Sequence, residues 1–183
     1  MKAVVIYESM YGNTKTIAEA IARGFGHGSE AVVVPVSQAR PESLDGADLV
    51  VVGGPTHVHG MSRASTRNGA AQAAAKPGSR LTLVPGAEGT GLREWFAGLG
   101  QVNVAAAAFD TRLDGVAVFT GRASKGVARQ LREHGCTLAT RPESFLVTGH
   151  NQLRAGEEAR ALGWGRLLSS KVVAMKLAAD SSS

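Results

Sequence analysis

Residues 2–14 read KAVVIYESMYGNT, a short run of apolar and β-branched residues followed at once by polar and small ones. An apolar run of this length, without polar alternation, is typical of a strand buried on both faces of a sheet. From Thr14 onward, apolar or small residues recur at helical spacing until Gly24 and Gly26, which indicate the end of a helix. These residues therefore predict a strand, a tight loop and a helix in direct succession.

The same kind of pattern continues along the chain. Four further apolar runs predict strands, at residues 31–36, 48–53, 102–109 and 144–147. Helical spacing predicts helices over residues 123–134 and, near the C-terminus, over a stripe between 161 and 175. Strands that alternate with helices in this way predict an α/β fold, a doubly wound, five-stranded parallel sheet with helices on both faces.

Residues 61–101 interrupt this alternation. They contain an alanine-rich piece, a Pro77-Gly78 break and a candidate helix around residues 92–99. We expect this segment to be a surface excursion from a single domain that spans residues 1–178. Residues 179–183 are expected to form a frayed, disordered tail.

The composition is that of a soluble globular protein, with 183 residues of which 44% are hydrophobic and 19% charged. The apolar runs are shorter than the roughly 20 residues of a membrane span, and the single cysteine, Cys136, cannot form an internal disulfide. We therefore expect a cytoplasmic protein without a membrane partner. The net charge of +5 points to an anionic ligand or partner, but dispersed basic residues and an aromatic content of 5% argue against nucleic acid.

The first candidate site is the loop after the first predicted strand. In a doubly wound sheet, ligands bind beyond the carboxyl ends of the strands, which directs attention to the loops after Tyr7, Gly53 and Phe109. The first of these loops contains Ser9, Met10, Tyr11, Gly12, Asn13 and Thr14. Unpaired amides at a helix N-terminus, with hydroxyl and amide side chains added, form a phosphate cradle. The loop matches neither a Walker loop nor a dinucleotide fingerprint, and the alternative is an ordinary capped helix start.

This N-terminal segment resembles the signature of the flavodoxin family. The matching residues are Tyr7-Glu8-Ser9, Gly12, Thr14, Ala18 and Ile21. The resemblance implies a parallel sheet of strand order 2-1-3-4-5 and a non-covalently bound FMN. It also implies that residues 9–14 wrap around the 5′-phosphate of that flavin.

The loop after the third predicted strand resembles the one that flavodoxins place beside the isoalloxazine ring. It contains Pro55, Thr56, His57, Val58, His59 and Gly60. The resemblance implies that His57 or His59 stacks on the ring or donates a hydrogen bond to N1 or N5. A metal site at these two histidines is not expected, because no Cys, Asp or Glu lies nearby to complete it. A purely structural loop is the alternative.

The third loop takes its assignment from its position after the fourth predicted strand. It contains Phe109, Asp110, Thr111 and Arg112. The resemblance implies that Thr111 and backbone amides bind N3 and O4 of the flavin, and that Phe109 or Arg112 covers the ring. Because histidine and arginine stand where many flavodoxins have tyrosine or tryptophan, we expect a less negative two-electron potential than in an acidic flavodoxin.

The sequence therefore predicts an FMN-binding electron-transfer protein of the flavodoxin type, in which the flavin performs the chemistry. Its redox donor and acceptor and its oligomeric state are not identified, and its basic charge argues against the partners that acidic flavodoxins use. One alternative is an NAD(P)H- or quinone-linked FMN reductase, for which residues 61–101 are long enough to shape a second pocket. The other is a non-catalytic module that uses the same cradle for a different phosphate ligand or for an interaction.

Overall fold

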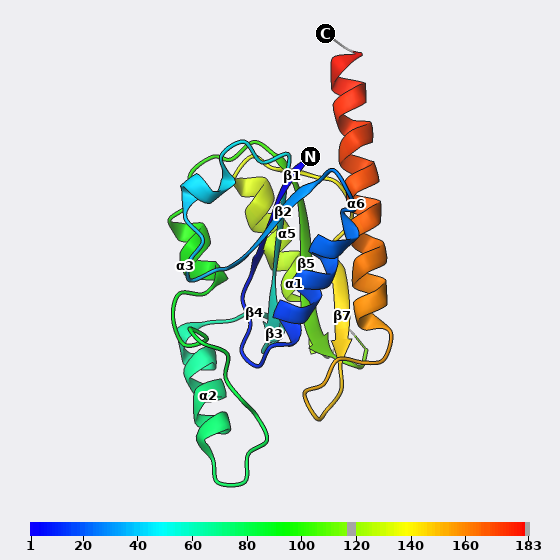
Figure 1. The fold of residues 1–183 in the computed structure, drawn as a ribbon. Helices are drawn as coiled ribbons and strands as arrows, with labels where there is room; N and C mark the ends of the chain where they lie inside the picture. Colours follow the sequence, from blue (N-terminus) through cyan, green and yellow to red (C-terminus); the bar gives the residue numbers. More distant parts are fainter. Residues whose placement is uncertain (117–119, 182–183) are drawn as a thin grey trace.

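The computed structural model describes residues 1–116 and 120–181, which form one seven-stranded sheet with helices on both faces (Figure 1). The strands are β1 Lys2–Tyr7, β2 Glu30–Pro35, β3 Leu49–His57, β4 Gly60–Met61, β5 Ala105–Leu113, β6 Thr137–Leu138 and β7 Glu143–Val147. The helices are α1 Asn13–Gly24, the short 3-10 helix η1 Pro41–Leu44, α2 Ala64–Ala75, α3 Leu92–Ala97, α5 Ala123–Glu133 and α6 Glu157–Asp180.

The strand order is β2-β1-β3-β5-β6, and neighbouring strands along this path are parallel. The predicted parallel sheet of order 2-1-3-4-5 is therefore confirmed. Its fifth position is divided between two short strands, because β6 pairs with the start of β5 and β7 pairs with residues 109–113. The first of these, β6, has only two residues, which are too few to carry an apolar pattern in the sequence.

Two strands continue further than the sequence predicts. The third strand, β3, runs past Gly53 to His57, and β5 runs past Phe109 to Leu113. A Cβ atom at Gly53 would lie 2.3 Å from the ring of Phe109. Glycine at position 53 therefore makes room for an aromatic ring rather than ending the strand, and residues 109–112 belong to β5 rather than to a loop.

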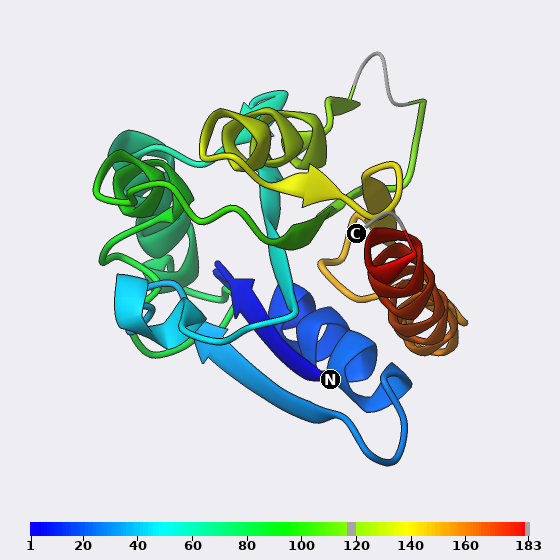
Figure 2. The same ribbon diagram turned by 90° about the horizontal axis from the view of Figure 1, so that it is seen from above.

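Helices cover both faces of the sheet (Figure 2), and each face has its own apolar core. Ala3 and Val5 pack under α1 and α6, whereas Val4 and Ile6 pack under α5 and α3, as the alternation of side chains along a strand requires. Because α3 contributes buried residues to this second core, only part of the segment 61–101 lies on the surface. Figure 1 shows α2 and the chain after it beyond the carboxyl ends of the strands.

The C-terminal helix α6 extends to Asp180, so residues predicted to lie in a tail are helical. Residues 182–183 of that predicted tail lie outside the part of the chain that the structure describes. Among the described residues, no helix is both long and apolar enough to cross a membrane.

Helices α1 and α6 touch through two glycines, and adding a methyl group there is expected to destabilise the fold. A Cβ atom at Gly165 would lie 2.2 Å from the carbonyl oxygen of Ile21, and one at Gly24 would lie 2.2 Å from the carbonyl oxygen of Leu162. Gly165→Ala should therefore lower the free energy of unfolding, measured by urea denaturation, by about 2–3 kcal/mol.

The matched control is Gly163→Ala on the same helix, because a Cβ atom at Gly163 meets no atom within 4 Å. Alanine is the better helix former, so this change should raise the free energy of unfolding by about 0.5–1 kcal/mol. Equal stabilities for the two variants would rule out a tight backbone contact between α1 and α6.

Candidate functional site

One cavity of about 170 Å³, here called the carboxyl-end cavity, opens where β1, β3 and β5 end. Its lining comprises Ser9, Met10, Tyr11, Asn13, Thr14, Pro55, Thr56, His57, Thr111, Arg112, Leu113, Val147 and Asn151. The three candidate segments thus supply ten of the thirteen lining residues. To these three segments the structure adds the end of β7 and the turn that contains Asn151. This turn could also have been predicted, because ligands bind at the carboxyl edge of the sheet, where β7 ends.

The cradle segment ends at the N-terminus of α1. Gly12 has φ 97°, and its carbonyl oxygen accepts the first helical hydrogen bond, from the amide of Thr16 at 3.0 Å. The Ser9 hydroxyl oxygen accepts the Gly12 amide at 3.1 Å, which closes the loop. No side chain of the described residues caps this helix, so the first amides of α1 keep their hydrogen-bonding capacity beside the cavity.

Hydrogen bonds tie the cradle to strand β5 and to the turn after β7. The hydroxyl oxygens of Thr14 and Thr111 lie 2.7 Å apart in a buried position, so one hydroxyl donates to the other and the second proton is left for another acceptor. The side-chain amide of Asn13 donates to the carbonyl oxygen of Asn151 at 3.0 Å. The cradle is therefore held by β5 and by the turn after β7.

The segment after β3 folds back as a hairpin with β4, in which His57 pairs with Gly60. The two residues between them have positive φ, 44° at Val58 and 69° at His59. Such a turn ordinarily contains Asn-Gly, and a β-branched residue at positive φ is strained. Strain of this kind is often found at functional sites. The pairing of His57 with Gly60 holds His57 beside the cavity.

The two histidines of this hairpin lie in different places. His57 lines the carboxyl-end cavity, whereas His59 pairs with Gly121 and lines a separate pocket. Burial lowers the pKa of His57, an effect that Glu8 opposes and Arg67 reinforces. The imidazole of His57 is therefore neutral at pH 7 and offers one hydrogen-bond donor and one acceptor.

Arg112 brings a positive charge to the cavity lining. One of its terminal nitrogens donates to the carbonyl oxygen of Gly115 at 2.8 Å and to the hydroxyl of Thr120 at 3.0 Å. Its Nε atom is buried and has no partner among the described residues. The uncapped helix N-terminus and the positive charge of Arg112 beside one cavity fit a ligand that carries a phosphate and further polar acceptors.

Other candidate residues have different surroundings. Phe109 and Asp110 are fully buried, Phe109 in the core under α6 and Asp110 as an acceptor for the amide of Ser124 at 2.7 Å. Burial raises the pKa of Asp110, and its hydrogen bonds to Ser124 oppose that effect. The hydroxyl oxygen of Thr56 accepts the amide of Ala123 at 3.0 Å. Asp110 and Thr56 therefore accept hydrogen bonds from amides at the start of α5. Val58 and His59 form the tip of the β3–β4 hairpin, and Gly60 is the first residue of β4.

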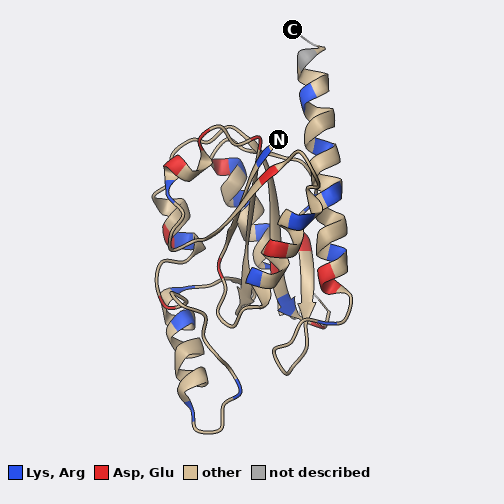
Figure 3. Ribbon diagram, viewed as in Figure 1, with Lys and Arg blue, Asp and Glu red and all other residues tan. Residues whose placement is uncertain are grey.

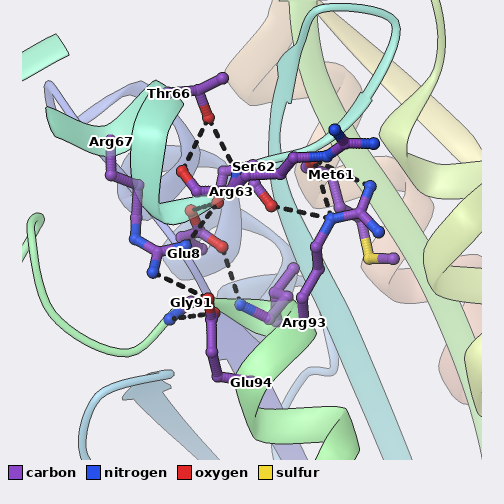
Figure 4. Close-up of polar contacts among 10 residues, drawn as sticks. Glu8, Met61, Ser62, Arg63, Thr66, Arg67, Gly91, Arg93 and Glu94 are labelled. Atoms are coloured by element: carbon purple, nitrogen blue, oxygen red, sulfur yellow. Dashed lines mark hydrogen bonds and ion pairs between the residues drawn. The ribbon is translucent and has the colours of Figure 1, made fainter. Parts of the chain in front are cut away.

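A buried polar network beside the cradle is not predicted from the sequence (Figure 4). The carboxylate of Glu8 accepts hydrogen bonds from the Ser62 hydroxyl and, at 2.8 Å, from the Leu92 amide. Arg67 donates to the Ser62 hydroxyl oxygen at 3.2 Å and to the Glu94 carboxylate at 3.0 Å. Because Glu8 directly follows β1, this network attaches the starts of α2 and α3 to the cradle.

Comparison with known proteins agrees with this architecture. The sequence model for flavodoxin matches residues 5–109, more than half of the chain, whereas a search of the curated proteins finds no match. A flavodoxin from the domain Archaea is 21% identical with a TM-score of 0.62, and the match covers 94% of this chain and 99% of that chain.

Two further solved structures are similar in fold. Oxidised Flavodoxin 1 from Bacillus cereus is 16% identical with a TM-score of 0.64, covering 93% of this chain and 98% of that chain. A flavodiiron core from Synechocystis sp. is 17% identical with a TM-score of 0.62, covering 96% of this chain and 36% of that chain. The likeness to these structures shows the fold, and the match to the family model shows the family. The chain therefore belongs to the flavodoxin family, whose cofactor is FMN.

Proposed function

We propose that the chain is an FMN-dependent electron-transfer protein that holds its flavin in the carboxyl-end cavity. The observation that carries this proposal is that all three candidate segments contribute to the lining of one cavity, which combines the uncapped N-terminus of α1 with the positive charge of Arg112. When bound, FMN supplies transfer of one or two electrons. The chain itself binds the flavin, orients it and sets its electrostatic surroundings.

Residues 9–14 hold the phosphate in this proposal. The first amides of α1 are neutral donors at the positive end of the helix dipole, which suits a singly phosphorylated ligand. In the hydrogen bond to the Gly12 amide, the Ser9 hydroxyl oxygen is the acceptor. The hydroxyl proton is not used in that bond and can be donated to the phosphate. One proton of the pair formed by Thr14 and Thr111 is free in the same way.

The ring lies against the hairpin segment 55–60 and the end of β5 in this proposal. His57, Thr111 and Arg112 contribute side chains, because all three line the cavity. Residues 109 and 110 act from within the fold, since their side chains pack the core and satisfy the start of α5. Arg112 is the cation expected to favour the reduced, anionic ring, because His57 is neutral at pH 7.

The test is titration of the purified protein with FMN, followed by flavin fluorescence and by the melting temperature. We expect flavin absorption bands in the bound protein and a melting temperature that rises with FMN concentration. Thr14→Ala and Asn13→Ala should each weaken FMN binding by about tenfold, which corresponds to about 1.4 kcal/mol.

The control is Thr16→Ala, which alters the same turn of α1 at a residue that does not line the cavity. If the loop serves only to begin a helix, Thr14→Ala and Asn13→Ala will lower the free energy of unfolding by about 1 kcal/mol, through loss of their hydrogen bonds to Thr111 and Asn151, without a specific effect on FMN. A protein that stays colourless and whose melting temperature is indifferent to FMN would favour the non-catalytic module instead.

A further inference from the structure

A second cavity of about 470 Å³, here called the basic pocket, shares the β3–β4 hairpin with the carboxyl-end cavity. Its lining comprises His59, Gly60, Met61, Arg93, Gly121, Arg122, Lys125, Gly126 and Arg129. Four of these nine residues are Lys or Arg, and no acidic residue is among them. Figure 3 shows Lys and Arg on helices throughout the molecule, so the distinctive feature of this pocket is that four basic residues gather around one cavity, whereas the carboxyl-end cavity has one.

Among the described residues, Arg93, Arg122 and Lys125 form no salt bridge with a carboxylate. The guanidinium of Arg93 is fixed by carbonyl oxygens, at 2.9 Å from Ser62 and 3.2 Å from Met61, which hold it in place without neutralising it. The Nε atom of Arg122 donates to the hydroxyl of Ser144 at 3.1 Å. Lys125 is exposed and forms no ion pair with any residue that the structure describes.

The remaining basic residue, Arg129, is also available to a ligand. Its contact with Glu133 spans 3.7 Å between two exposed side chains of the same helix. Such exposed pairs are weak and are easily replaced by a better acceptor. Arg122 also acts on the buried carboxylate of Asp110, so Arg93, Lys125 and Arg129 are the cations that act mainly on the pocket, and together they attract an anion.

Three glycines shape the pocket. A Cβ atom at Gly126 would lie 3.4 Å from the terminal carbon of Met61, and one at Gly60 would lie 3.8 Å from a terminal nitrogen of Arg93. Gly121 has φ 75°, and a Cβ atom there would lie 2.1 Å from the Cα atom of His59. Glycine at position 121 is therefore required by the close contact of its backbone with His59, whereas Gly60 and Gly126 are simply residues without a side chain in the pocket lining.

We propose that the basic pocket binds the pyrophosphate or phosphate-ester group of a small-molecule ligand. Guanidinium groups match phosphate oxygens in charge and in geometry, and a lysine adds a mobile positive charge. The pocket is concave and is lined by three glycines, and sites for small molecules are typically concave. We therefore assign the pocket to a small molecule and not to a partner protein. The basic residues that bind the phosphate group all lie outside the carboxyl-end cavity, so this binding does not require FMN in that cavity, although the two cavities share the β3–β4 hairpin.

The probes are inorganic pyrophosphate, NADH and NADPH, titrated calorimetrically into the protein at low salt. Wild-type protein is expected to bind pyrophosphate, and binding should weaken as salt is added. Lys125→Gln combined with Arg129→Gln should weaken it at least tenfold, because each change removes a charge-assisted contact. Arg132→Gln is the matched control, an exposed arginine on α5 that does not line the pocket, and it should leave binding unchanged.

The three probes also identify the source of the phosphate group. Tighter binding of NADH or NADPH than of pyrophosphate supports the proposal with a dinucleotide as the ligand, and a preference for NADPH shows that the extra phosphate is used. Absence of wild-type binding to all three probes, or an equal loss in Arg132→Gln, overturns the proposal. FMN binding is measured in the wild-type protein and in the same variants. A wild-type protein that binds pyrophosphate in the basic pocket but does not bind FMN contradicts only the proposed function.

Discussion

Replacing Arg67 with methionine is expected to lower the free energy of unfolding by about 1–3 kcal/mol, because it removes the ion pair with Glu94 and leaves the buried carboxylate of Glu8 without the cation that is joined to it through the Ser62 hydroxyl. Arg67 is 3% exposed and Glu8 is 4% exposed. Both groups approach the same point, since a Cβ atom at Gly91 would lie 2.4 Å from a terminal nitrogen of Arg67 and 2.9 Å from a carboxylate oxygen of Glu8. Urea denaturation at pH 7 measures the change.

The comparison that isolates this effect is the double variant Glu8→Gln with Arg67→Met. It removes both buried charges, so the free energy of unfolding should fall by less than in Arg67→Met alone. The control for loss of a surface arginine is Arg132→Met, which should change the free energy of unfolding by less than about 0.5 kcal/mol. If the double variant were less stable than Arg67→Met, the carboxylate of Glu8 would not depend on the guanidinium.

This network shows where prediction from the sequence ends. Glu8, Ser62 and Leu92 are joined by hydrogen bonds across 54 and 84 positions. Each of these residues has an ordinary local context, and nothing in a one-dimensional pattern tells which polar residues will be buried together. The strands, in contrast, are evident because burial on both faces requires apolar side chains at successive positions.

The candidate site is predictable for a different reason. Parallel strands end at the same edge of the sheet, so the segments after them meet even when they are far apart in the sequence. The exact strand ends are not predictable from polarity, because Asp110 and Thr111 look like loop residues and yet belong to β5. Pairing with β3 and β7 satisfies their backbone groups, and Asp110 receives a partner from the start of α5.

The sequence at residues 58 and 59 is Val-His and lacks the Asn-Gly pair that ordinarily indicates a tight hairpin turn. Both residues have positive φ, a conformation that ordinarily selects Asn and Gly. Val58 is 83% exposed, so its conformation is imposed by the strands on either side and not by its own packing. A local rule failed at a position that lies between the two cavities, which is where functional constraints are expected to override local preference.

Replacing Gly12 with alanine is expected to weaken FMN binding at least tenfold, a loss of about 1.4 kcal/mol in binding free energy. Gly12 has φ 97°, and its carbonyl oxygen begins the hydrogen bonding of α1. A residue with a Cβ atom avoids this conformation at a cost of about 1–2 kcal/mol. Alanine would therefore favour a negative φ at residue 12. The loop would change direction there, and the first amides of α1 would no longer converge on the phosphate. Flavin fluorescence gives the dissociation constant.

The control for this prediction is Gly26→Ala beyond the other end of the same helix. Gly26 also has positive φ, 78°, and a Cβ atom there meets nothing within 4 Å. Both variants should therefore lose about 1–2 kcal/mol of folding free energy through the same backbone strain, but only Gly12→Ala changes the cradle. A fall in FMN affinity in Gly12→Ala alone would assign phosphate binding to the start of α1. An equal fall in both variants would mean that the flavin responds to the stability of the helix, and the cradle would then lose its assigned role.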